Sequence, residues 1–105
     1  MQTIQRYQIR IPGQDPERHR ATIFLVGEGT LRAALGRVHF LDDGSQLPAD
    51  AKGDDGLIDM HLPLAAFAGV VAMLQHDRPV MISFRGGRGE LRTGEWEPVG
   101  ETEGA

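Results

Sequence analysis

Two histidines and one aspartate have the residue types of a metal site. Asp59 and His61 are two residues apart in a segment that alternates apolar and polar residues, so both side chains lie on one face of the strand expected there. His39 belongs to a second alternating segment and shares a face with Arg37. Two histidines with one carboxylate are the ligand set of non-haem iron sites. A metal site at His39, Asp59 and His61 requires the two strands to be neighbours, and a solvated sheet face with incidental histidines is the alternative.

Arginines supply a second candidate site. The segment FRGGRGELR places three arginines around a glycine turn whose backbone amides suit a phosphate or a single-stranded nucleic acid. The residues that we expect to contact such an anion are Arg6, Arg10, Arg85, Arg88 and Arg92. Glu90 lies among them, so a solvated hairpin is the alternative. A net charge of −4 argues against binding of duplex DNA through bulk charge.

Four residues also resemble a fragment of a known nucleotide-binding pattern. Arg6-x-x-x-Arg10 and Asp43-x-Ser45 are similar to the PilZ pattern, in which two arginines and an Asp-x-Ser-x-x-Gly turn hold cyclic di-GMP. The resemblance implies a nucleotide ligand at these positions. The chain departs from the pattern at Pro48, which replaces the glycine, and the C-terminal helix of that family is not predicted.

Little in the sequence supports catalysis. Ser45 and Ser83 are the only serines, and neither lies in a strand-to-helix turn that would expose a nucleophile. The aspartate-rich segment 42–56 has Lys52 where a calcium loop needs Asp or Asn, and Asp55 where it needs Gly. There is no cysteine, which excludes disulfides and thiolate zinc sites. The sequence favours a protein that is not an enzyme and has no cofactor.

The elements that must position these residues are mainly strands. Alternating or β-branched segments predict strands at 3–11, 21–26, 30–41, 57–62, 79–85 and 90–96, with a bulge or bend at Gly36. One helix is predicted at about 63–76, with Pro63 at its first position. Because one helix cannot cover a flat six-stranded sheet, we expect an α+β, mainly antiparallel fold: a small curled sheet or partly open barrel of about six strands. The order of elements is similar to that of the OB-fold.

The predicted helix has an unusual composition. No residue from Leu62 to Gln75 is charged. Larger side chains form one stripe, at Leu64, Phe67, Val71 and Leu74, and the opposite face is small, consisting of Ala65, Ala68, Gly69 and Ala72 with Met73 beside it. A helix that is apolar all round is normally buried all round, so we expect a buried helix, either inside the fold or with its small face against another subunit. A glycine within a helix costs about 1 kcal/mol relative to alanine, which favours a packing role.

Length and composition bound the organisation of the chain. With 105 residues, 40% hydrophobic and 25% charged, we expect one globular domain at 1–97, a long, solvated acidic loop at 42–56 and a disordered acidic tail at 98–105. The N-terminal residues lack the apolar run of a secretory signal, and the uncharged stretch 62–75 is shorter than the roughly 20 residues that span a bilayer. The expected location is cytoplasmic, with no membrane contact.

Together these observations predict a small non-catalytic binding or assembly module that acts through protein contacts. We expect a homodimer or a protein partner at Ala65, Ala68, Gly69, Ala72 and Met73. The alternative is a nucleic-acid or nucleotide binder that uses the arginine-rich hairpin. A metal-dependent enzyme at His39, Asp59 and His61 is the third hypothesis.

Overall fold

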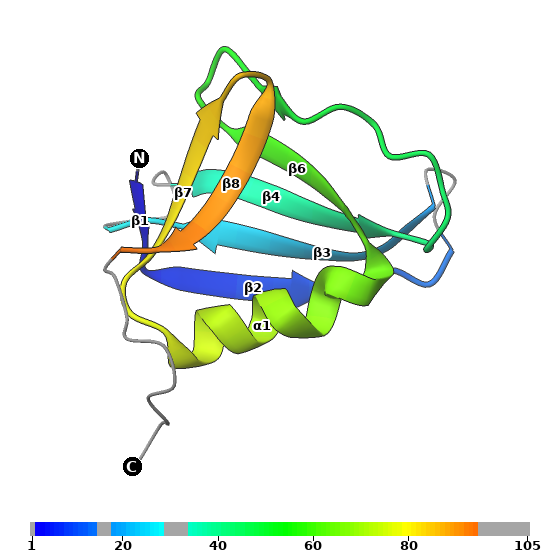
Figure 1. Ribbon diagram of the computed structural model, residues 1–105, viewed down its shortest axis with the longest axis horizontal. Coiled ribbons are helices and arrows are strands. Elements are labelled where there is room, and N and C mark those ends of the chain that lie inside the picture. Colours follow the sequence, from blue (N-terminus) through cyan, green and yellow to red (C-terminus); the bar gives the residue numbers. More distant parts are fainter. Residues whose placement is uncertain (1, 15–17, 29–33, 95–105) are drawn as a thin grey trace.

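The computed structural model describes residues 2–14, 18–28 and 34–94. These residues form a three-stranded sheet with the order β1-β7-β8 and a five-stranded sheet with the order β2-β3-β4-β6-β5, with one helix against them (Figure 1). The elements are β1 (Gln2–Ile4), β2 (Arg6–Arg10), β3 (His19–Val26), β4 (Ala34–Leu41), β5 (Ala51–Lys52), β6 (Ile58–Pro63), α1 (Phe67–His76), β7 (Val80–Arg85) and β8 (Arg88–Thr93). The α+β class with mainly antiparallel strands is confirmed, but the described part of the chain contains eight strands in two sheets, and no barrel closes.

The segment expected as one strand at 3–11 forms two strands, one in each sheet. β1 pairs with β7, whereas β2 pairs with β3 in the other sheet. The two strands meet at Gln5, whose backbone N–H donates to the carbonyl of Val26 at 2.9 Å. The N-terminal segment therefore joins the two sheets.

β4 and β6 form a parallel pair, unlike the other pairs of the described sheets. Residues 42–57 cross from the end of β4 back to the start of β6 and include the short strand β5. The register places Arg37 opposite Asp59 and His39 opposite His61. The strand of His39 and the strand of Asp59 and His61 are thus neighbours, as the predicted cluster requires.

Alternate residues of both sheets form the core. The largest fully buried side chains are Phe40, Ile23, Leu25, Ile82 and Val38. β4 also approaches β6 closely at Gly36, where an added Cβ would lie 2.6 Å from the carbonyl oxygen of Ile58. The β3–β4 register shifts next to this residue, so the predicted irregularity at Gly36 is confirmed.

The helix differs from the prediction. Residues Leu64–Ala66 form a 3-10 turn before α1, and Val70 is the only buried residue of α1. Phe67 packs edge-on against Phe40, with ring centroids 5.1 Å apart, but Leu64 is exposed rather than part of the buried stripe. The expected buried helix is thus wrong for the single chain, because the sheets cover one side of α1 and leave the opposite side open.

Several predicted features lie outside the described residues. They are the tail 98–105, the last residues of the strand expected at 90–96, and residues 30–33 of the strand expected at 30–41. Within the described ranges, no helix has the length and apolar character needed to cross a membrane.

Candidate functional site

The predicted histidines and aspartate meet on the outer face of the five-stranded sheet. Three imidazoles stack across β3, β4 and β6: the rings of His19 and His39 have centroids 4.6 Å apart, and those of His39 and His61 are 5.1 Å apart. Their planes differ by 20° and 24°. The sequence pattern predicts His39 and His61 as members of this cluster. It does not predict His19, because this residue precedes the apolar run that predicts the strand.

Asp59 links the stack to an arginine. Its carboxylate accepts hydrogen bonds from Nε and Nη2 of Arg37 at 2.8 and 3.0 Å, and from Nε2 of His39 at 2.9 Å. Burial raises the pKa of Asp59, but the hydrogen bonds from Arg37 and His39 outweigh burial, so the pKa lies below its ordinary value. Asp59 is therefore an ionised acceptor with both oxygens engaged.

His39 is the most buried member of the stack. Burial lowers its pKa, and the neighbouring His19 and His61 lower it further, while the hydrogen bond to Asp59 acts in the opposite direction. Because an ionised carboxylate can only accept, Nε2 of His39 carries the proton in the neutral ring. Its Nδ1, 3.3 Å from Oγ1 of Thr22, then accepts from the hydroxyl.

The arrangement does not support the metal hypothesis. The lone pairs of imidazole lie in the plane of the ring, so stacked rings direct their nitrogens side by side rather than towards one point. The carboxylate of Asp59 is already held by Arg37. In the part of the chain that the structure describes, no three His, Asp or Glu side chains form a group that could hold a metal ion.

Asp50 connects the outer face of the five-stranded sheet to the β7–β8 hairpin. Its two carboxylate oxygens accept from the backbone N–H groups of His61 and Gly89, each at 2.9 Å. The Nδ1 atom of His61 is buried without a hydrogen-bond partner, 3.6 Å from the carboxylate of Asp50. One side chain thus connects the segment 42–56, β6 and β8.

The acidic segment 42–56, expected to be solvated, makes further contacts of this kind. Asp42 accepts two hydrogen bonds from Arg20, which lower its pKa, and Asp43 accepts from the backbone N–H of Ala65 at the start of the 3-10 turn. Asp55 accepts from the backbone N–H of Leu57. Asp42, Asp43 and Asp50 therefore anchor this segment, and the Asp43 carboxylate bonds to the 3-10 turn rather than lying with Arg6 and Arg10.

The five arginines predicted as one contact surface occupy two places. Arg85, Arg88 and Arg92 lie on the exposed face of the β7–β8 hairpin and line a cavity of about 540 Å³ together with Glu90. The arginines of β2 line a different cavity, of about 480 Å³, on the outer face of the five-stranded sheet. The two cavities share no lining residue.

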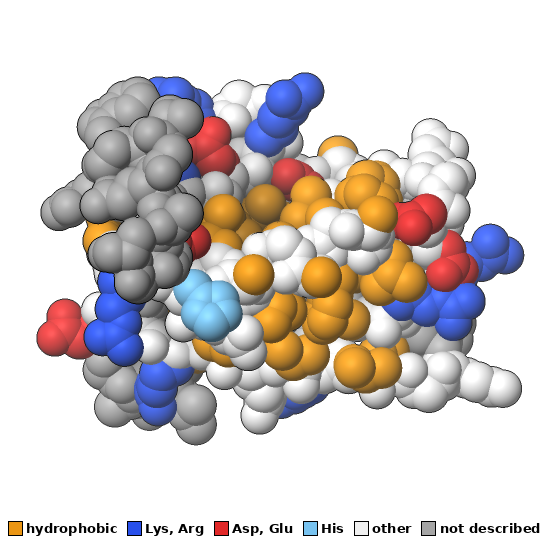
Figure 2. Space-filling model, turned by 60° about the horizontal axis from the view of Figure 1, so that its bottom comes forward, with side chains coloured by type: hydrophobic (Ala, Val, Ile, Leu, Met, Phe, Trp, Pro, Cys, Tyr) orange, Lys and Arg blue, Asp and Glu red, His pale blue; other side chains and the backbone are white. Residues whose placement is uncertain are grey.

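The small face of the helix is open to solvent. Ala65, Ala68, Gly69 and Ala72 are exposed, and a Cβ added at Gly69 would meet nothing within 4 Å. Large apolar side chains are exposed nearby, with Leu64 at 37%, Ile9 at 36% and Ile11 at 73%. Figure 2 shows apolar side chains gathered across this face of the molecule, over α1 and the adjoining β2. We call this surface, made of Ile9, Ile11, Leu64, Ala65, Ala68, Gly69, Ala72 and Met73, the apolar band.

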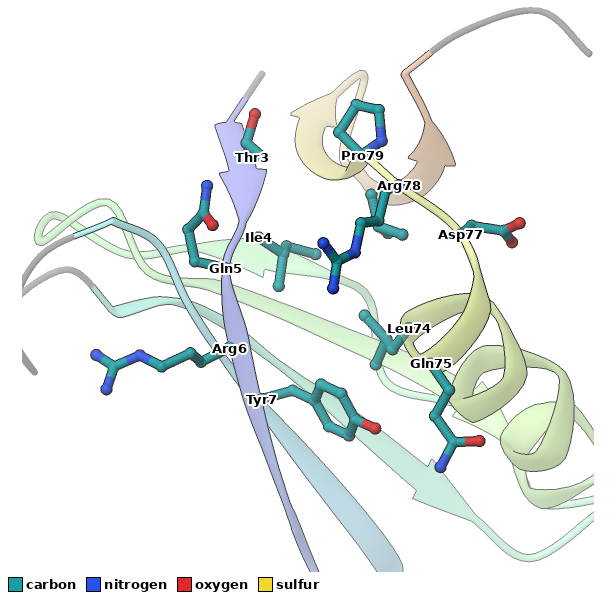
Figure 3. A pocket seen from close by; sticks show the side chains of 11 residues that line it. Thr3, Ile4, Gln5, Arg6, Tyr7, Leu74, Gln75, Asp77, Arg78 and Pro79 are labelled. Atoms are coloured by element: carbon teal, nitrogen blue, oxygen red, sulfur yellow. The ribbon is translucent and has the colours of Figure 1, made fainter.

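A cleft of about 660 Å³ lies at the C-terminal end of α1, and polar or charged side chains such as Arg6, Asp77 and Arg78 form part of its lining. In Figure 3, Ile4 and Tyr7 point from the N-terminal strands towards the helix, and Leu74 and Arg78 lie on the opposite wall. Leu74 and Tyr7 both pack against the core. The helix therefore stands apart from β2 at this end.

No family model matches the chain, and comparisons with curated proteins and with solved structures found no match.

Proposed function

We propose that this protein is a non-catalytic assembly module that forms a homodimer through the apolar band. The observation that carries the proposal is the exposure of Ala65, Ala68, Gly69 and Ala72 on a helix with no charged residue between Leu62 and Gln75. An exposed helix face normally carries polar residues, and a contiguous apolar patch on a soluble domain indicates a contact surface.

The shape of the band suits a second copy of the same chain. Small residues allow two helix backbones to approach closely, and larger side chains at Leu64 and Met73 flank them, so that a two-fold axis would place the ridges of one copy against the groove of the other. Burial of Gly69 in such a contact would offset its cost of about 1 kcal/mol within a helix. No charge of the 62–75 segment would lose its hydration.

The polar face of the sheet supports the non-catalytic part of the proposal. Arg37 and His39 both donate to Asp59 and leave no carboxylate oxygen of Asp59 without a partner. A satisfied network of this kind is typical of a structural role, whereas a general acid or base needs a proton-transfer partner in a substrate.

Light scattering coupled to gel filtration, with native mass spectrometry, tests the homodimer. We expect twice the chain mass of 11.5 kDa for the unmodified protein at micromolar concentration. Gly69→Leu should return the mass to that of one chain, because the larger side chain holds the helices apart. Ala51→Leu is the control, since Ala51 is also exposed and lies on β5, at the opposite edge of the five-stranded sheet from β2.

Circular dichroism shows whether both variants fold. A single-chain mass for the unmodified protein over the whole concentration range overturns the proposal. A Gly69→Leu variant that stays dimeric also overturns it, because the contact would then lie elsewhere.

A further inference from the structure

The outer face of the five-stranded sheet carries a basic hollow that the assembly proposal does not use. The hollow, about 480 Å³, lies over β2, β3 and β4. Three arginines line it, Arg6, Arg10 and Arg37, around the apolar side chains of Phe24, Val26, Ala34 and Leu57, and its lining contains no Asp or Glu. Its chemistry is therefore that of a site for an anion with an apolar part.

Phe24 and Arg10 form a stack at this hollow. Gln8 lies opposite Phe24 and Arg10 opposite Thr22 in the β2–β3 register, so these side chains share the outer face. The guanidinium carbon of Arg10 lies 4.3 Å from the centroid of the Phe24 ring, and its Nε donates to Oε1 of Gln8 at 2.9 Å. Two contacts thus hold the guanidinium, and neither of them uses its terminal amino groups.

The charges of the lining arginines are not equivalent. Arg37 forms an ion pair with Asp59 through two hydrogen bonds. Arg10 has no carboxylate partner among the described residues; its described contacts are with Gln8 and Phe24. Arg10 is therefore the group at which an anion would gain the most.

We propose that this hollow binds a ligand that joins a planar aromatic ring to an anionic group, which is the chemistry of a nucleotide. The aromatic ring of the ligand stacks on the Arg10 guanidinium, which itself lies over the Phe24 ring, and the anionic oxygens accept from the terminal amino groups of Arg10. Planar bases stack on aromatic and guanidinium planes irrespective of their sequence, so the ligand is a free nucleotide or a nucleotide of a single strand. The lining of the hollow contains none of the residues of the apolar band.

Titration calorimetry with three probes tests the site: adenosine monophosphate, a six-residue thymidine oligonucleotide and inorganic phosphate. We expect the nucleotide probes to bind and inorganic phosphate to bind at least about tenfold more weakly, because it has no ring to stack. An oligonucleotide that binds about tenfold or more tightly than the monophosphate identifies a single strand as the source, and equal affinities identify a free nucleotide.

Three variants locate the binding. Arg10→Gln and Phe24→Leu should each weaken binding of the nucleotide probes by about tenfold or more. Arg88→Ala on the hairpin is the matched control and should leave the affinity within about twofold, since that arginine is exposed and lies at the other cavity. Arg10 is exposed, so Arg10→Gln keeps the test valid even if Phe24→Leu folds poorly.

Three results would overturn the site: no binding of either nucleotide probe at millimolar concentration, phosphate affinity equal to nucleotide affinity, or a loss in Arg88→Ala as large as in Arg10→Gln. The last result would move the anion contact to the hairpin. None of these results bears on the homodimer, which is measured without ligand.

Discussion

The imidazole of His39 is buried between two other imidazoles and bonds to an ionised aspartate. Protonation of His39 would place a positive ring between His19 and His61 in a site that already disfavours charge through burial. Asp59 compensates for this only in part, since the pKa of His39 remains below its ordinary value of 6.5. The stability of the fold therefore depends on pH through the protonation of His39.

We expect the protein to lose stability as the pH falls below about 6.5. The folded chain holds the proton of His39 less readily than the unfolded chain, so the stabilising contribution is complete above the unfolded pKa and decreases as the pH falls through the window between the two values. Urea unfolding at a series of pH values from 8 to 5 measures it. His39→Gln should show a smaller slope than the unmodified protein, and the exposed His76→Gln should not; equal slopes in both variants would contradict this origin.

At the scale of elements, local patterns predicted most of the strands and the hairpin, but not β5, the division of 3–11 into β1 and β2, or which strands are neighbours. Alternation placed Asp59 and His61 on one face, as the structure confirms, because side-chain direction follows from the strand backbone itself. The parallel pairing of β4 with β6 depends on the path that residues 42–57 take between the two strands. The hydrophobic periodicity of the sequence does not predict that path. Nor could composition show whether this uncharged helix is buried within one chain or has a face exposed on it.

The return path depends on Asp50, so its removal should destabilise the fold. Asp50→Ala leaves the backbone N–H groups of His61 and Gly89 without their acceptor, and we expect the free energy of unfolding to fall by about 2 kcal/mol. Urea unfolding measures the change. Asp54→Ala is the control, because Asp54 is exposed on the same segment. A change below about 0.5 kcal/mol in Asp50→Ala would show that water replaces the carboxylate without loss.

At the scale of the whole molecule, the apolar band and the basic hollow lie on opposite sides of the five-stranded sheet. The band belongs to α1 and the core-facing side of β2, whereas the hollow belongs to the outward side chains of β2, β3 and β4. Association through the band would consequently leave the hollow accessible in each copy. The two proposals can therefore hold in the same assembly.

Association also makes stability depend on concentration. For a homodimer, the thermal midpoint should rise with protein concentration, because folding and association are coupled by mass action. Differential scanning calorimetry over a hundredfold range of concentration measures the rise. Gly69→Leu should have a midpoint that is independent of concentration. A midpoint that stays constant for the unmodified protein would contradict coupled association.

The place of β1 in the three-stranded sheet bears on the order of folding. Gln2 lies opposite Ile82 and Ile4 opposite Val80, so this contact closes almost the whole described chain into a loop. Such distant contacts cost conformational entropy before packing compensates for it, and they slow folding. The β7–β8 hairpin pairs residues that are close in sequence, and hairpins of this kind typically form within about 1–10 μs. We therefore expect the β7–β8 hairpin to form early and the pairing of β1 with β7 to be the last step of folding.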